Sequence, residues 1–165
     1  MRKHLSFSSS FFLLIAVALL VGVVEAEPQA DRLSVGKLGF PVIPDRISGC
    51  GPMGGLHAAL SAGRSDWNLV VACDMPAVSY ELLAELLAAA EESGADALVP
   101  STPEGWQPLC AVYHVRLLPA VEAAIHAKRL KMHDFVSSIP ARFWPAPDAS
   151  LFRNVNTPEQ FMEIR

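Results

Sequence analysis

The stretch LVVACDMP (Leu69–Pro76) decides the fold of this chain, because an uncharged apolar run in it ends abruptly on a carboxylate and a proline then stops the run. Strands that are covered on both faces read as continuous hydrophobic runs. In open α/β sheets, ligands bind outside the carboxyl ends of such strands. The stretch therefore predicts a central, nearly solvent-free strand that delivers Asp74 to a ligand site.

A glycine-rich turn precedes this strand. It reads GPMGG (Gly51–Gly55) and runs directly into a segment of small residues, for which we expect a helix over 53–62. Exposed backbone N–H groups and the helix dipole at such a point favour an anion. Taken alone, the glycine cluster is equally explained as a tight connection. Together with Asp74, it suggests a site for a phosphate and a metal ion.

Turn residues and hydrophobic spacing predict that strands and helices alternate along the rest of the chain. Ser79 can cap a helix whose leucines recur at helical spacing, and Gly94 ends this helix. Further strands are expected at 97–100, 109–114 and 143–144, and further helices from Pro119, at 132–139 and from Thr157. Strands that alternate with helices imply an α/β fold with a parallel-rich sheet.

The composition fits one domain with a single core and excludes several functions. The chain has 165 residues, of which 52% are hydrophobic and 18% are charged. Its net charge of -4 provides no basic surface for a nucleic-acid backbone, so we expect no nucleic-acid partner. Its three cysteines show no C-x-x-C spacing, which argues against a disulfide framework or a zinc knuckle. Cys73 and Cys110 lie in apolar runs and are predicted to be core residues.

The front of the chain has the form of a secretory signal peptide. Arg2 and Lys3 precede an unbroken apolar run at Phe11–Val24, and small residues around Ala26 offer a cleavage point. A membrane-spanning helix needs about 20 apolar residues, so the shorter run makes a permanent anchor the weaker interpretation. If it is retained, we expect this segment to be the part of the chain that meets a membrane.

Several motifs occur together in an order that resembles the molybdenum cofactor guanylyltransferase family. They are Asp45, the GPMGG turn with its helix, the VVACDMP strand, the sequence QPL before the strand CAVYH (Gln107–His114), and the sequence FRNVNTPE (Phe152–Glu159). The similarity runs from about Asp31 to Arg165.

The resemblance implies an α/β fold with a three-layer, mostly parallel Rossmann-like sheet of the nucleotide-diphospho-sugar transferase type, N-terminally incomplete. Residues 45–165 would form the nucleotidyltransferase-like domain, residues 27–44 a linker with a first short strand, and residues 1–26 the signal-peptide-like segment. Enzymes of this family transfer GMP from GTP to the terminal phosphate of molybdopterin, which gives the guanine dinucleotide form of the molybdenum cofactor and pyrophosphate. The resemblance thus implies GTP and molybdopterin as substrates, Mg²⁺ as the metal, and a cytoplasmic location unless residues 1–26 export the chain.

The resemblance also assigns roles to individual residues. Asp74 would bind the metal and the nucleotide, and a carboxylate at a strand end suits Mg²⁺, which takes one or two carboxylates together with phosphate oxygens. Asn154 and Asn156 flank one apolar residue, so their side chains share a face. They would be the catalytic residues that line the reaction site. The other nucleotide contacts would be Asp45, Gly51, Gly54 and Gly55.

Simpler explanations stay open for these residues when the sequence is taken alone. Asp74 can cap the turn that follows it, and Asp45 can be a turn residue after Pro44. The asparagine pair can satisfy the turn before the terminal helix. Basic residues that could attract a phosphorylated pterin are Lys128, Arg129, Lys131, Arg142 and Arg153. Such residues are more common as surface charges than as phosphate clamps.

The family's signature loop, L-x-G-G-x-S-x-R-M-G-x-x-K, follows the first strand and wraps the nucleotide phosphates, and it is absent from this sequence. The segment GKLG (Gly36–Gly39) does not replace it. We therefore expect the first strand, the first helix and this loop to be replaced by the signal-like segment, and the chain to be little active by itself. The alternatives are a catalytically inactive remnant that binds a pterin or a partner, a related cytidylyl or sugar-phosphate nucleotidyltransferase, and an exported protein of unrelated role.

Overall fold

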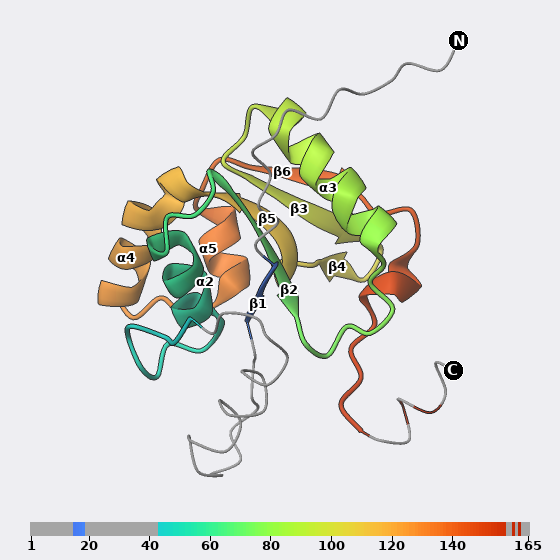
Figure 1. Ribbon diagram of the computed structural model, residues 1–165, viewed down its shortest axis with the longest axis horizontal. Helices are drawn as coiled ribbons and strands as arrows, with labels where there is room; N and C mark the ends of the chain where they lie inside the picture. The colour runs from blue at the N-terminus through green and yellow to red at the C-terminus, as the bar shows by residue number, and fades with distance from the viewer. Residues whose placement is uncertain (1–14, 19–42, 158–159, 161, 163–165) are drawn as a thin grey trace.

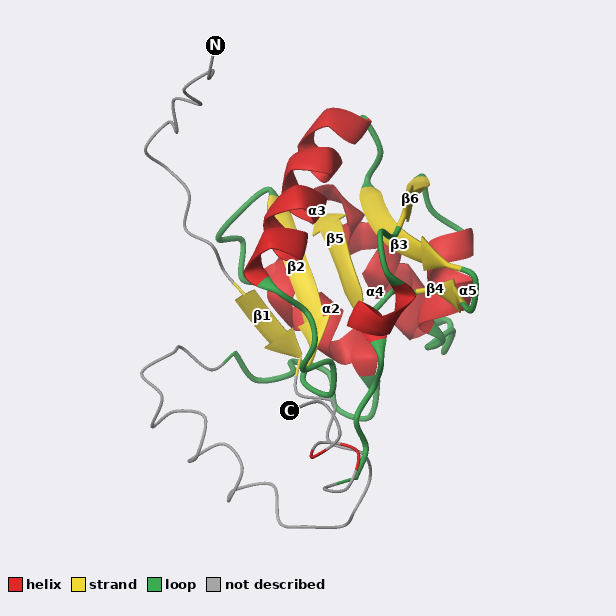
Figure 2. Cartoon of the chain, turned by 90° about the vertical axis from the view of Figure 1, so that its right-hand side faces the viewer, coloured by secondary structure: helices red, strands yellow, loops and turns green. Residues whose placement is uncertain are grey.

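The computed structural model has three layers, with helices on both faces of one β-sheet (Figure 1; Figure 2). It describes residues 15–18, 43–157, 160 and 162. One face of the sheet carries α3 (Tyr80–Ser93). The opposite face carries α2 (Pro52–Ser61), α4 (Leu118–His126) and α5 (Met132–Ser137). Two short 3-10 helices are η1 (Val115–Leu117) and η2 (Ala149–Phe152). The three-layer α/β fold is confirmed.

Within the described residues, the sheet has six strands in the order β1, β2, β5, β3, β4, with β6 also paired to β3. The strands are β1 (Ile15–Ala18), β2 (Trp67–Ala72), β3 (Ala97–Thr102), β4 (Gly105–Trp106), β5 (Cys110–His114) and β6 (Ala141–Pro145). β1 pairs in parallel with β2, and β6 pairs in parallel with β3. β5 is antiparallel to its neighbours β2 and β3, and β4 is antiparallel to β3. The sheet is therefore mixed.

The expectation of a mostly parallel sheet needs correction because of β5. This strand returns from β3 after only the short β4, and a parallel neighbour would need a crossover of about a dozen residues or more. A short connection therefore brings β5 back antiparallel. The predicted strands at 97–100, 109–114 and 143–144 are present as β3, β5 and β6.

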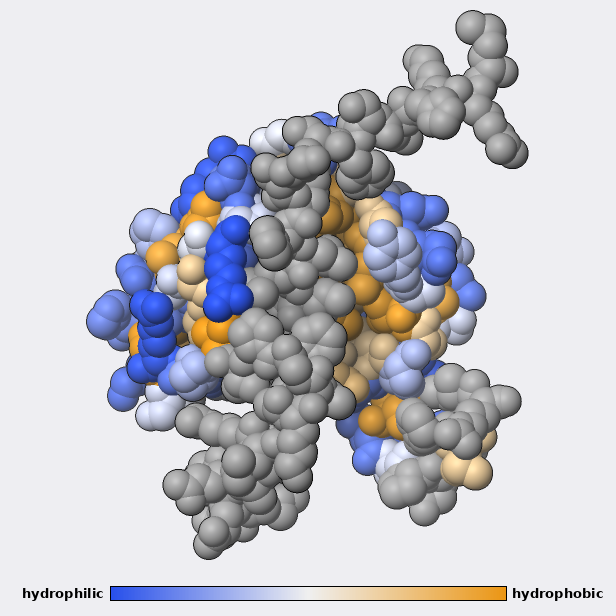
Figure 3. Space-filling model, viewed as in Figure 1, coloured by the Kyte–Doolittle hydropathy of each residue, from blue (hydrophilic) through white to orange (hydrophobic). Residues whose placement is uncertain are grey.

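β2 is a central strand, as the apolar run predicts, because it pairs with β1 on one side and β5 on the other. Its residues alternate between the two faces of the sheet: Leu69 packs in a cluster with Leu86 of α3, and Val70 packs with the helices of the opposite face. Figure 3 shows an apolar area on the side of the molecule where α3 lies and mainly hydrophilic side chains along the rim.

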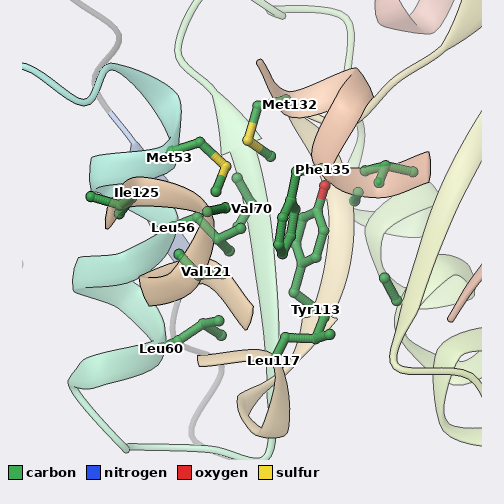
Figure 4. Packing of buried hydrophobic residues seen from close by; sticks show 14 of the residues in the cluster. Met53, Leu56, Leu60, Val70, Tyr113, Leu117, Val121, Ile125, Met132 and Phe135 are labelled. Atoms are coloured by element: carbon green, nitrogen blue, oxygen red, sulfur yellow. The ribbon is translucent and has the colours of Figure 1, made fainter. Parts of the chain in front are cut away.

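The largest cluster of buried residues lies between β2 and β5 and the helices α2, α4 and α5 (Figure 4). Its labelled members are Met53, Leu56, Leu60, Val70, Tyr113, Leu117, Val121, Ile125, Met132 and Phe135. All of these side chains are less than one tenth exposed, so the helix and strand faces that the sequence marks as apolar meet in one core.

The cysteine prediction is half right. Cys110 is buried in β5, and burial raises the pKa of its thiol to about 12, so it stays protonated as a core residue. Cys73 is exposed, which contradicts the prediction, because β2 ends at Ala72 and the next residue already lies in the turn. Cys50 is buried beside α2.

α3 forms where the sequence predicts a helix, and its ends show why. The Ser79 hydroxyl accepts a hydrogen bond from the Leu82 backbone N–H at 3.3 Å, which satisfies a free donor of the first turn. Gly94 follows the last turn with φ 66°, a left-handed conformation that suits glycine. The local residues alone therefore fix both ends of this helix.

The apolar run near the front of the chain contributes a strand to the sheet. β1 pairs in parallel with β2, with Ile15 opposite Leu69 and Ala18 opposite Ala72. The first strand is therefore present, and the expectation that it is replaced is wrong. Cleavage after Ala26 stays a prediction, and the linker assigned to residues 27–44 falls outside the described residues except for its last two. Among the described helices, none is long and apolar enough to cross a membrane.

Candidate active site

The parallel strands and the helices that connect them place several predicted site residues at one edge of the sheet. β2, β3 and β6 run in one direction, so their carboxyl ends meet at this edge, which we call the carboxyl edge. α2 leads back into β2 and therefore begins at the same edge, and α3 begins there because it follows β2. Ligands of α/β sheets bind at this position.

Asp74 lies in the turn directly after β2 and is half-buried. Its Oδ1 atom is buried and has no hydrogen-bond partner among the described residues. A buried carboxylate oxygen without a partner is costly, because the charge has left water without compensation. Carboxylate oxygens are preferred ligands of Mg²⁺, and this cation often uses one or two of them with waters and phosphates. Asp74 therefore fits a cation site.

The described residues hold no group of three or more His, Cys, Asp and Glu side chains that could bind a metal by themselves. A metal at Asp74 would therefore take its other ligands from water and from a bound phosphate. This arrangement is typical of magnesium that arrives with a nucleotide, and it differs from a closed structural site.

The segment with Asn154 and Asn156 is tied directly to the Asp74 turn. The backbone N–H of Val155 donates a hydrogen bond to the Asp74 carbonyl oxygen at 2.8 Å. On the other side, the Asn156 backbone N–H donates to Gln160 Oε1 at 2.8 Å, and the Gln160 N–H donates to Thr157 Oγ1 at 3.3 Å. Both asparagine side chains are exposed. The structure thus brings the predicted asparagine pair to the predicted metal ligand.

β5 and the segment before it hold the other side of the Asp74 turn. The Ala72 N–H donates to the Leu109 carbonyl at 2.7 Å, and the Gln107 N–H donates to the Pro100 carbonyl of β3 at 2.9 Å. The buried Tyr113 hydroxyl donates to the Pro108 carbonyl at 2.8 Å. Burial, with a smaller contribution from Cys110, raises the pKa of Tyr113, so this hydroxyl keeps its proton. The QPL sequence therefore fixes the turn.

Asp45 and the glycine turn form a second part of the site. Gly51 precedes α2 with φ 53°, and the Gly54 N–H donates to its carbonyl at 2.9 Å. Asp45 is exposed, and its Oδ2 atom lies 3.1 Å from the point where a Cβ on Gly54 would stand. The missing side chain at Gly54 is therefore what lets Asp45 approach the first turn of α2. No hydrogen bond among the described residues links Asp45 with Asp74.

Replacing Gly54 by alanine is expected to weaken GTP binding by a few fold. The new Cβ would also stand 3.3 Å from the Ile47 carbonyl oxygen and 3.3 Å from Cys50 Cβ, so the segment from Asp45 to Cys50 has to shift. The folded chain should lose little stability, because alanine favours the helix by about 1 kcal/mol over glycine. Titration calorimetry with GTP, alongside a thermal melt, measures both effects. Unchanged affinity would show that Asp45 does not contact the nucleotide.

The basic residues that could attract a phosphorylated pterin lie at different edges of the sheet. The connection between α4 and α5 carries three exposed basic residues, Lys128, Arg129 and Lys131. α4 follows the antiparallel strand β5 and therefore starts at the opposite edge of the sheet. Its end, and the connection that follows it, lie at the carboxyl edge. Arg142 instead donates to the Ser93 carbonyl at 3.5 Å, at the opposite edge where α3 ends. Arg153 is exposed beside Asn154. The structure therefore removes Arg142 from the candidate site.

The structure also shows an aromatic group that the sequence analysis missed. Trp106 of β4 stacks on Phe143 of β6 with ring centroids 4.3 Å apart and 27° between the planes. On α5, His133 lies 6.0 Å from Trp106 at 22°. These rings come from three separate segments, so no local pattern in the sequence signals them.

Comparisons with known proteins identify the family of this chain. Residues 13–139 match the MobA-like NTP transferase domain, so the family similarity begins inside the apolar run and not at about Asp31. A "Probable molybdenum cofactor guanylyltransferase" of Flavobacterium johnsoniae is 32% identical over 147 residues, which cover 87% of this chain and 74% of that protein. A protein with the same description from Geobacillus sp. (strain WCH70) is 33% identical and is aligned over 99% of this chain and 89% of its own.

Solved structures give the same result. The crystal structure of "Molybdopterin-guanine dinucleotide biosynthesis protein A" from Archaeoglobus fulgidus is similar with a TM-score of 0.70 and 30% identity, over 82% of this chain and 71% of that one. 2-C-methyl-D-erythritol 4-phosphate cytidylyltransferase from Thermus thermophilus shares the fold at a TM-score of 0.53 and 18% identity, over 70% of this chain and 68% of that one. The chain belongs to the MobA-like NTP transferase family.

Proposed function

We propose that this chain transfers GMP from GTP to the terminal phosphate of molybdopterin, forming the guanine dinucleotide molybdenum cofactor and pyrophosphate. The observation that carries the proposal is the buried Oδ1 of Asp74 at the carboxyl edge, which has no hydrogen-bond partner within the described part of the chain. The backbone carbonyl of Asp74 accepts a hydrogen bond from Val155, between Asn154 and Asn156. Relatives named for this reaction, at 32% to 35% identity, support the choice of substrates. The supply of GTP favours the cytoplasm as the place of the reaction.

The chemistry requires one bond to form and one to break. An oxygen of the acceptor phosphate attacks the α-phosphorus of GTP, and the bond from that phosphorus to the β-phosphate oxygen breaks, so pyrophosphate leaves with the electron pair. A magnesium ion held by Asp74 would offset the negative charge of the phosphates during this exchange. Asn154 and Asn156 flank Val155, whose N–H is hydrogen-bonded to the Asp74 carbonyl, and in this proposal their amide groups orient the acceptor phosphate.

The nucleotide is bound by the second part of the site in this proposal. The positive end of the α2 dipole, which follows the turn Gly51–Gly55, attracts a phosphate of GTP, while the N–H groups of Gly54 and Gly55 hold the turn by donating to the Gly51 carbonyl. Asp45 accepts hydrogen bonds from the nucleoside of GTP. Hydrogen bonds on both sides of the Asp74 turn keep the carboxylate in place before substrate arrives, which reduces the reorganisation that the reaction needs.

The purified chain is expected to form the guanine dinucleotide cofactor slowly, at a rate below about 1 per second, the lower end for typical enzymes. A triphosphate needs several backbone donors and a cation, and the sequence lacks the loop that provides them in the family. The reaction is followed by pyrophosphate release and by chromatography of the dinucleotide, with GTP, Mg²⁺ and molybdopterin as reactants.

A chain with a family-type loop grafted between β1 and α2 is the control, and it should gain activity because the residues at the carboxyl edge are unchanged. CTP in place of GTP tests the cytidylyl alternative. If the grafted chain forms no dinucleotide with either nucleotide, the proposed transfer is wrong and a binding protein is the better interpretation. A fast reaction of the ungrafted chain would show that other residues surround the triphosphate.

A further inference from the structure

Three aromatic rings at the carboxyl edge have no part in the chemistry proposed for Asp74. They are His133 of α5, Trp106 of β4 and Phe143 of β6, here called the Trp106 stack. Trp106 is half-buried and packs against the main core, so it anchors the group. Phe143 is 38% exposed and His133 is exposed, so the outer rings are open to solvent.

The Trp106 stack is connected to the Asp74 turn through the backbone. Trp106 lies opposite Ser101 near the end of β3. Two residues separate it from Leu109, whose carbonyl accepts a hydrogen bond from the Ala72 N–H. β4 lies on the same edge of β3 as β5, because Ala97 and Ser101 both pair with β6 on the other edge. At about 4.8 Å for each strand spacing, Phe143 of β6 stands about 14 Å from the line of β2, and Trp106 lies nearer to it. An extended molecule can therefore reach from the rings to Asp74.

The stack and the glycine turn lie on opposite sides of Asp74. α2 packs over β1 and β2, so Asp45 and the turn at Gly51 belong to that end of the sheet. The rings lie at the other end, where β3, β4 and β6 meet. Two ligands that approach from these two sides would meet at Asp74, as the two substrates of a transfer reaction must.

Charge near the stack favours an anionic ligand. Lys131 stands two residues before His133, and Lys128 and Arg129 precede it in the same exposed connection. Exposed aromatic faces bind flat heteroaromatic rings by stacking and tolerate a range of ring types. The chemistry that fits is therefore an extended molecule with a heteroaromatic ring at one end and a phosphate toward Asp74.

We infer that the Trp106 stack binds the pterin ring of the acceptor and that the acceptor phosphate extends from it along the carboxyl edge to Asp74. This inference rests on the proposed function, which provides a pterin as the second substrate. It assigns acceptor specificity to Trp106 and Phe143, whereas the glycine turn and Asp45 bind the nucleotide.

The test measures pterin binding without any turnover. The full chain is titrated with 6-hydroxymethylpterin and with its monophosphate, and binding is followed by quenching of tryptophan fluorescence and by equilibrium dialysis. Trp106→Ala and Phe143→Ala are each expected to weaken binding by about tenfold, and Trp106→Phe to retain it within about threefold, because stacking needs a ring and not an indole. The phosphate form should bind more tightly.

Tyr80→Ala is the matched control, since Tyr80 is 70% exposed but stands at the start of α3, on the other face. It should leave pterin binding unchanged, and none of the variants should change magnesium-dependent GTP binding. Wild-type affinity in folded Trp106→Ala and Phe143→Ala chains, or displacement of the pterin by guanosine, would overturn the inference. If Trp106-dependent pterin binding is found but no dinucleotide forms, the proposed function fails and the pterin site stands.

Discussion

Replacing Asp74 by asparagine is expected to weaken magnesium-dependent GTP binding by about tenfold or more, and to lower the transfer rate of the loop-grafted chain by about 100-fold. Asparagine keeps the shape of the side chain but removes its charge, and a neutral amide oxygen is a weaker ligand for Mg²⁺ than a carboxylate. The melting temperature should stay the same or rise, because Oδ1 has no hydrogen bond to lose among the described residues and the buried charge is gone. Calorimetry with and without Mg²⁺ measures the binding.

Asp66→Asn is the matched control for this experiment. Asp66 is exposed and precedes β2 at the opposite edge of the sheet, so the same change of charge is made at the other end of the same strand. GTP binding should be unaffected there. Equal affinity of wild-type and Asp74→Asn chains, both with and without Mg²⁺, would remove Asp74 from the metal site.

Replacing Val112 by aspartate is expected to unfold the protein. Val112 has no exposed surface, and it lies on β5 between Leu69 of β2 and Leu98 of β3, under α3. An unpaired charge at such a position costs several kcal/mol, which is comparable with the total stability of about 5–15 kcal/mol of a small domain. Urea denaturation followed by circular dichroism should therefore show no cooperative transition, or one at a much lower midpoint.

Ala88→Asp places the same charge on the exposed side of α3, which covers this part of the sheet. Its cost should stay below about 1 kcal/mol, because the carboxylate remains in water and only helix propensity changes. A Val112→Asp chain that melts at the wild-type midpoint would mean that β5 is not a buried central strand.

Local signals in the sequence were sufficient to predict the elements whose ends are set by their own residues. The Ser79 cap and the Gly94 stop define α3 without help from the rest of the fold. The charge that ends the apolar run places Asp74 after β2, and the threonine cap with Gln160 explains how the segment beside it is held. The family resemblance then selected Asn154 and Asn156 from among many polar residues, and the structure brings their segment to Asp74.

Features that depend on distant segments could not be predicted in the same way. An apolar run without a period reads alike as a signal peptide and as a strand, so β1 was missed. The apolar run before Asp74 extends one residue beyond β2, and this explains why Cys73 was wrongly predicted to be buried. The direction of β5 depends on the length of its connection, and the Trp106 stack is assembled from three elements that meet only in the folded chain.

The pairing of β1 with β2 has a consequence for the solubility of the chain. Removal of residues 1–26 by a protease would take β1 away and leave the N–H and C=O groups of β2 on that side without a strand partner. The exposed edge would belong to the apolar segment Leu69–Ala72. Open edges of this kind template pairing with other chains, and the result is aggregation or strand exchange. β1 thus protects the molecule from self-association as well as extending its sheet.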